Sequence, residues 1–180
     1  MRALSLLGAM ALLFAMVLGA CSSPTRSSRS FQSEDWKEFQ GTWTAVGSRN
    51  TMLLEGNHSA AISNFEGPIV LVGPSRPGVG FRADAIVFSD SVTGLVGRAV
   101  WTDDKDDKVF SELHGEGTAA HNKITGTIVG GTGRYAGATG SYEFSWQFVL
   151  QNEDGSVQGQ SAGLNGRVRV GPPDSAGTHL

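Results

Sequence analysis

The sequence predicts an all-β domain, built as a barrel or a sandwich. Short runs of β-branched and aromatic residues recur roughly every ten residues, and hardly any stretch shows a helical period. Residues that favour turns separate the runs, for example at Asp103–Asp107 and Glu153–Gly155. The connections are short, which favours an antiparallel meander over crossover connections.

The clearest strand covers residues 141–151, where apolar and polar side chains alternate. This alternation is typical of a strand with one buried face. The apolar face carries Tyr142, Phe144, Trp146, Phe148 and Leu150. Further strands are expected at 41–48, 60–65, 69–72, 81–88, 94–102, 108–116, 122–129 and 157–170, with a short pairing segment at 52–54. We expect Glu66-Gly67-Pro68 to divide two of these strands, and residues 73–80, which contain two prolines, to form a rigid loop.

Residues 130–140, GGTGRYAGATG, form a glycine-rich turn between two of the expected strands. Arg134 and Tyr135 are its only bulky residues, so we expect them to plug or cover one end of the domain. The turn fits the pattern G-x-G-x-x-A, but a dinucleotide site of this type needs a helix next, and an aromatic strand follows instead. We therefore expect no nucleotide cofactor.

The same turn, followed by the aromatic strand, resembles the hallmark of the allene oxide cyclase and dirigent protein superfamily in its bacterial members. The resemblance is sharpest over residues 130–148 and extends loosely over 43–170. It implies an eight-stranded antiparallel calycin-like β-barrel, often a homotrimer, with an apolar ligand cavity and no cofactor. None of the family's catalytic residues can be placed on this chain by motif.

The N-terminus has the features of a secretory signal, with a short basic start, an apolar run at 3–18 and small residues before Cys21. Leu18-Gly19-Ala20-Cys21 resembles a bacterial lipoprotein box, so we expect residues 1–20 to be removed and Cys21 to carry the lipid. Ser22 is not the aspartate that retains many such lipoproteins in the inner membrane. We therefore expect an envelope lipoprotein of the outer membrane that faces the periplasm.

This interpretation divides the chain into four parts. Residues 21–35 are a lipidated cysteine and a Ser-rich tether, 36–171 the β-barrel domain, and 172–180 a loose tail. Residues 36–39 are either a helical turn or an extended lead-in. Cys21 is the only cysteine, so a disulfide within the chain is excluded.

Charge and ligand spacing argue against several partners. Removal of residues 1–20 takes away only Arg2, so the net charge goes from −3 to −4, with 13 basic and 17 acidic residues. A mildly acidic domain without a basic stripe argues against nucleic acid. The spacing of His114, Glu116 and His121 matches no strong zinc pattern, and Lys105 within the acidic hairpin tip argues against calcium, so we expect no metal.

If Asp103–Asp107 form a hairpin loop, the pairing between the strands expected at 94–102 and 108–116 can be predicted. Arg98 then faces Glu112, and Val96 faces His114. Both faces of this hairpin are substantially apolar, which suggests a lumen on one side and a subunit contact on the other. If Arg98, Glu112 and His114 face the lumen, they are candidate catalytic residues; the alternative is a structural ion pair at a rim or a subunit contact. Any ligand would lie at this end of the lumen, lined further in by Tyr142, Phe144 and Trp146.

Three classes of function stay open. The first is a lipid-anchored barrel that binds a small apolar or amphipathic molecule. The second, implied by the resemblance, is a cofactor-free cyclase or isomerase. The third is a protein-binding module of the inhibitor type that uses an exposed loop, for which residues 73–80 are the best candidate.

Overall fold

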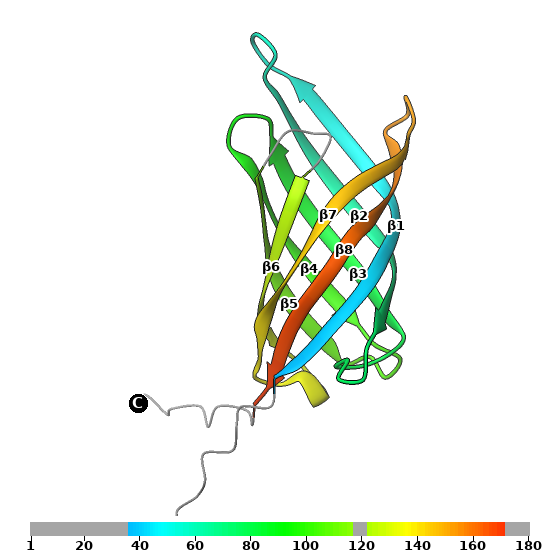
Figure 1. Ribbon diagram of the computed structural model, residues 1–180. Helices are drawn as coiled ribbons and strands as arrows, with labels where there is room; N and C mark the ends of the chain where they lie inside the picture. Colours follow the sequence, from blue (N-terminus) through cyan, green and yellow to red (C-terminus); the bar gives the residue numbers. More distant parts are fainter. Residues whose placement is uncertain (1–35, 117–121, 172–180) are drawn as a thin grey trace, which may run out of the picture. The chain divides into compact units, whose positions relative to one another are not determined.

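The computed structural model describes residues 36–116 and 122–171. They form eight antiparallel strands in a closed barrel, each strand hydrogen-bonded to its neighbours in the chain and β8 to β1 (Figure 1). The strands are β1 (Lys37–Leu53), β2 (Ser59–Val72), β3 (Phe81–Asp90), β4 (Gly94–Thr102), β5 (Lys108–Glu116), β6 (Asn122–Gly131), β7 (Ala138–Gln151) and β8 (Ser156–Val170). The prediction of an all-β, eight-stranded antiparallel barrel is confirmed.

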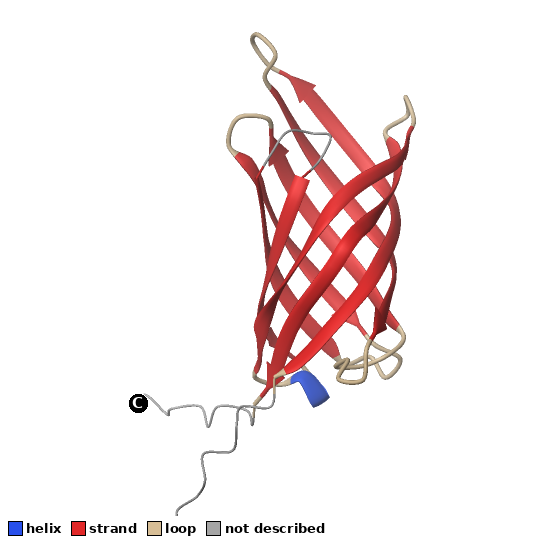
Figure 2. Ribbon diagram, viewed as in Figure 1, coloured by secondary structure: helices blue, strands red, loops and turns tan. Residues whose placement is uncertain are grey.

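The two ends of the barrel differ. One end carries the β1–β2, β3–β4 and β7–β8 connections, and we call it the β1–β2 end. The other carries the β2–β3 loop, the β4–β5 loop and the 3-10 turn η1 (Gly133–Tyr135), and we call it the η1 end. Figure 2 shows η1 as the one helical segment among the described residues, at the base of the barrel as drawn.

Side chains alternate between the interior and the outer surface along each strand. Many of the inward positions carry aromatic residues, so aromatic rings fill much of the lumen. Trp43, Trp101, Tyr142, Phe144 and Trp146 are all less than 8% exposed. They contact one another directly: ring centroids lie 5.0 Å apart between Trp43 and Trp146, and 4.7 Å apart between Trp101 and Tyr142. The fold is therefore held by a continuous aromatic core.

Glycines opposite the aromatic rings make room for them. Gly126 pairs with Tyr142, and a Cβ at this glycine would collide with the Tyr142 ring. A Cβ at Gly159 would likewise collide with the Trp146 ring. The lumen is thus packed by rings that lie over bare backbone, so these glycines are needed for their lack of a side chain.

Two details of the strands differ from expectation. β1 begins at Lys37, so the start of the domain is extended, and β2 runs without a break through Glu66-Gly67-Pro68. The predicted division there is wrong because β2 stays paired with β3 through this point, with Gly67 opposite Ala83 and Pro68 opposite Arg82. On its other side, Pro68 lies where no residues of β1 and β2 are paired, between Trp43↔Ile69 and Val46↔Glu66, so its missing N–H is tolerated.

Several expectations concern residues outside the described part of the chain. These are the signal at 1–20, the lipidated Cys21 with the tether to residue 35, His121 and the tail at 172–180. Within the described residues, no helix has the length and apolar character to cross a membrane.

Candidate functional site

A small cavity opens among the lumen residues at the β1–β2 end of the barrel. Its volume is about 60 Å³. Apolar walls come from Trp43, Phe65, Phe144, Trp146 and Phe148. Polar side chains at its rim are Arg49, Ser59, Ser89, Asp90 and Ser91. The site thus combines an apolar interior with a polar mouth, an arrangement common to sites for small molecules.

Arg49 is the cation of this mouth. It continues the inward-facing series of β1 that starts with Phe39 and Trp43, and its guanidinium carbon lies 5.3 Å from the centre of the Phe148 ring. Its Nη1 donates a long hydrogen bond of 3.4 Å to Oε1 of Gln151, while its Nε is buried with no hydrogen-bond partner. Within residues 36–116 and 122–171, Arg49 has no carboxylate within ion-pair distance.

Asp90, at the same rim, is already saturated with donors. Its Oδ1 accepts hydrogen bonds from the backbone N–H groups of Val92 (2.8 Å) and Thr93 (3.0 Å), and its Oδ2 lies 2.8 Å from Nε2 of His58. The Thr93 N–H first, and then the His58 side chain, lower the pKa of Asp90 to about 2. Asp90 is therefore ionised at neutral pH, and hydrogen bonds from its own neighbours stabilise its charge.

Deeper in the lumen, side chains leave very little free volume. A second void of about 10 Å³ lies between Trp43, Trp101, Tyr142 and Leu164. Burial raises the pKa of the Tyr142 hydroxyl to about 12, so this group is neutral at physiological pH. The interior below the mouth is therefore dry core, and the accessible part of the lumen is the mouth alone.

The η1 end is closed by the glycine-rich turn, as the sequence indicated. Tyr135 is 1% exposed and packs on Phe81, with their ring centroids 5.7 Å apart. The neighbouring Arg134 is held by the acidic β4–β5 loop: its Nε donates to Oδ2 of Asp103 (2.7 Å) and its Nη2 to Oδ1 of Asp104 (2.9 Å). We call Arg134 and Tyr135 the plug of the η1 end. The carboxylates of the β4–β5 loop hold this plug in place.

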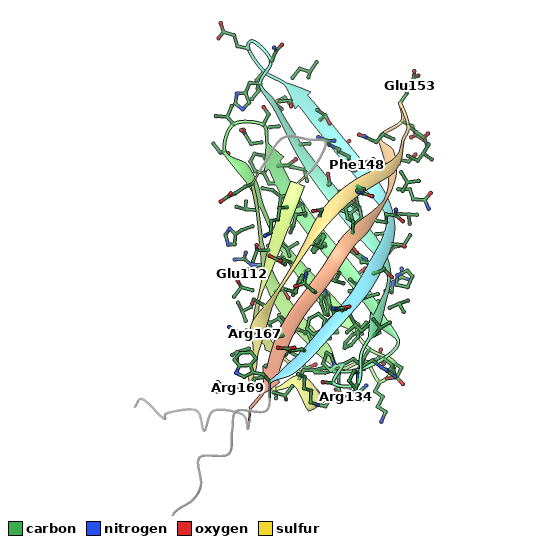
Figure 3. All side chains as sticks on the ribbon, viewed as in Figure 1. Glu112, Arg134, Phe148, Glu153, Arg167 and Arg169 are labelled. Atoms are coloured by element: carbon green, nitrogen blue, oxygen red, sulfur yellow. The ribbon has the colours of Figure 1, made fainter. Side chains whose placement is uncertain are left out.

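The hairpin register predicted from the sequence is confirmed, but its orientation is not. Arg98 pairs with Glu112 and Val96 with His114, and the Arg98 Nη2 lies 3.0 Å from the Glu112 Oε1. These side chains point to the outer surface, where the side chains of Arg98 and Glu112 are 67% and 40% exposed. Figure 3 places Glu112 on the wall of the barrel. The prediction that they share the lumen with Tyr142, Phe144 and Trp146 is wrong, because the apolar residues of the opposite face fill the interior.

Of the expected lumen residues, Phe144 and Trp146 line the mouth cavity, while Tyr142 lies below it. The sequence interpretation missed Arg49. Its signal was available in the spacing: Trp43, Ala45, Gly47 and Arg49 occupy alternate positions of one strand and so share one face. The strand expected at 41–48 ended one residue too early to include it.

Among the described residues, no group of three or more His, Cys, Asp or Glu side chains is placed to hold a metal ion. Comparisons of the chain with models of protein families, with curated proteins and with solved structures found no match.

Proposed function

We propose that this protein is a lipid-anchored lipoprotein of the bacterial cell envelope whose barrel binds a small amphipathic acid at its β1–β2 end. The anionic head contacts Arg49, and the apolar tail enters the cavity between Phe144, Trp146 and Phe148. The observation that carries the proposal is the Arg49 guanidinium, which lies at an apolar mouth without a carboxylate partner among the described residues.

The chemistry of Arg49 favours a carboxylate or a similar anion. A guanidinium is always charged and presents donors in a planar fork, and its contacts with carboxylates are stronger than those with neutral acceptors. Among residues 36–116 and 122–171, the side chain of Arg49 makes one long hydrogen bond of 3.4 Å, to the neutral Gln151 side chain. An incoming anion would bind the terminal nitrogens of Arg49 without displacing a strong partner.

The volume of the cavity limits the length of the apolar tail that can bind. A space of about 60 Å³ holds on the order of four water molecules, which corresponds to a tail of about four methylene groups. Burial of such a tail contributes about 3 kcal/mol, and a charge-assisted hydrogen bond adds about 1.5 kcal/mol. Since the cost of association is set against these gains, the tightest Kd that we expect is on the order of 1 mM. The filled lumen below the mouth favours binding at the rim over enclosure of a large substrate.

A ligand screen tests this proposal. Trp43 and Trp146 line the cavity, so their fluorescence reports on its occupancy. We expect short-chain carboxylates to change the emission of the protein at concentrations about tenfold lower than neutral epoxides of the same chain length, and alkylamines to leave the emission unchanged. An emission change with amines, or no change with any acid up to tens of millimolar, would contradict the proposal.

The anchor is tested separately. Two or more acyl chains on Cys21, each contributing about 0.8 kcal/mol per buried methylene, would hold the protein stably in a membrane. Cys21→Ser is expected to release the protein into the soluble fraction or to block its processing. If the Cys21→Ser protein is processed and still fractionates with membranes, the proposed anchor is wrong.

A further inference from the structure

Exposed apolar side chains gather on one part of the outer wall of the barrel. Ile62 of β2, Phe88 of β3 and Val96 of β4 are 59%, 44% and 50% exposed, and Ile86 of β3 is 67% exposed. The pairing of the strands makes them neighbours, because Ile62 lies opposite Phe88 and Phe88 lies opposite Val96. Side chains opposite each other on one face lie about 5 Å apart, and Ile86 is two residues from Phe88 on the same face. We call Ile62, Ile86, Phe88 and Val96 the apolar strip.

The apolar strip belongs to one side of the barrel. Its three strands, β2, β3 and β4, lie side by side in the closed sheet (Figure 1). In the middle of β7 and β8, on the opposite side, the outward positions carry polar residues: Ser145, Gln147, Gln158 and Gln160. Single apolar side chains at a surface are ordinary, whereas a contiguous group of them marks an interaction site.

Charged residues border the apolar strip on the side of the η1 end. Arg98 lies opposite Ile86 and forms an ion pair with Glu112, with 3.0 Å between Nη2 and Oε1. The other charged residues of this border are Glu66, Arg82 and Asp84, of which the first two form a second ion pair. An apolar centre with a polar rim is the composition of a protein interface. Burial of these charges in a lipid interior would be costly, which argues against a membrane as the partner.

The size of the apolar strip suits a dimer of small domains. Its four side chains present roughly 400 Å² of apolar surface, which is in the range of the patches that are functional on single domains. A protein interface of standard size buries about 800 Å² on each partner, and about 60% of that area is apolar. The apolar strip therefore supplies most of the apolar centre that such an interface needs, and its charged border supplies part of the rim.

We propose that a second copy of this chain covers the apolar strip, so that the protein is a two-fold symmetric dimer joined through β2, β3 and β4. Both copies then use the same surface, so the apolar centre of one meets that of the other. The border carries both signs of charge, so the acidic residues of one copy can face Arg82 and Arg98 of the other. None of the four residues of the apolar strip lines the mouth cavity, so the inference does not depend on the proposed ligand.

Sedimentation equilibrium of the full chain tests the proposal. All samples carry Cys21→Ser, so that the result does not depend on the lipid anchor. We expect a dimer at micromolar concentration. Val96→Asp should raise the Kd of the dimer at least about tenfold, because two-fold symmetry buries the new carboxylate twice. Val129→Asp is the matched control and should leave the Kd unchanged, since Val129 is 53% exposed on β6, outside the apolar strip.

A crosslinking experiment locates the contact independently. With Cys21→Ser in place, Ile86→Cys supplies the only thiol of the chain, and a bismaleimide should join two copies through it. Val129→Cys should stay uncrosslinked under the same conditions. A chain that remains monomeric up to about 100 µM would overturn the proposal, and so would a trimer, because a three-fold ring joins two different surfaces. Equal effects of the two aspartate variants, or equal crosslinking of the two cysteine variants, would also overturn it.

Discussion

Nε of Arg134 donates a hydrogen bond of 2.7 Å to Oδ2 of Asp103, whose side chain is fully buried. This contact joins two turns 31 residues apart in the chain, the glycine-rich turn that contains η1 and the acidic β4–β5 loop. Burial alone would raise the pKa of Asp103, but the Lys105 N–H and the Arg134 guanidinium hold it below its ordinary value. The plug at the η1 end therefore depends on an ionised buried carboxylate.

The Asp103–Arg134 pair is expected to contribute more to stability than the Arg98–Glu112 pair. Removal of Arg134 leaves a buried charge unpaired, whereas the exposed pair contributes about 0–1 kcal/mol. Double-mutant cycles of the free energy of unfolding, with Asp103→Asn and Arg134→Gln in one and Arg98→Gln and Glu112→Gln in the other, measure both couplings. Equal coupling energies would show that the plug is not fixed by this contact.

Gly133→Ala should destabilise the protein by at least about 2 kcal/mol. Gly133 has a φ of +50°, which costs about 1 kcal/mol for a residue with a Cβ, and that Cβ would also collide with the Asp107 carboxylate. Gly56→Ala is the matched control, because Gly56 has a φ of +71° with nothing within 4 Å of a Cβ. Chemical denaturation that gives the same loss for both variants would rule out the collision.

Gly126→Ala should destabilise the barrel by about 1–3 kcal/mol, since the added methyl group overpacks the lumen against the Tyr142 ring. The loss should be smaller when Tyr142→Leu removes the ring. Denaturation of the two single variants and of the double variant gives the comparison. If Gly126→Ala lowers the free energy of unfolding equally with and without the Tyr142 ring, the destabilisation comes from the backbone and not from overpacking.

Asp90→Asn should lower the melting temperature at neutral pH, and the difference from wild type should shrink in acid. The folded-state pKa of about 2 is below the ordinary value of 3.8, so the stabilisation by Asp90 is present above about pH 4 and is lost as the pH falls toward 2. Asparagine keeps an acceptor for the Val92 and Thr93 N–H groups, so the change removes mainly the charge. A difference that stays constant between pH 5 and pH 2 would contradict the assigned pKa.

The sequence pattern was sufficient for the all-β class and for local pairing, whereas the closed eight-stranded barrel was expected only from the family resemblance. Turn residues fixed the loop at Asp103–Asp107, and the register Arg98↔Glu112 followed from that loop alone. Alternation also identified Phe144 and Trp146 as interior residues. These are local properties of one strand or one hairpin.

The sequence could not assign the faces of the β4–β5 hairpin or assemble the mouth. Both faces of that hairpin carry apolar residues, so periodicity leaves open which one is buried, and closure of the barrel decides it. Arg49, Asp90 and Phe148 come from β1, β3 and β7, and only the closed barrel brings them together. The ion pair between Arg134 and Asp103 likewise forms only because the closed barrel brings the glycine-rich turn next to the β4–β5 loop.

The most direct test of the proposed function is a calorimetric titration of the protein with hexanoate and with 1-hexanol, which share a tail and differ in the charge of the head. We expect hexanoate to bind wild type and the Arg98→Gln control with a Kd in the millimolar range, and to bind Arg49→Gln about tenfold more weakly. Hexanol should bind wild type and Arg49→Gln equally. If hexanoate binds Arg49→Gln as well as wild type, or does not bind at all, the assignment of the mouth as a site for an amphipathic acid is wrong.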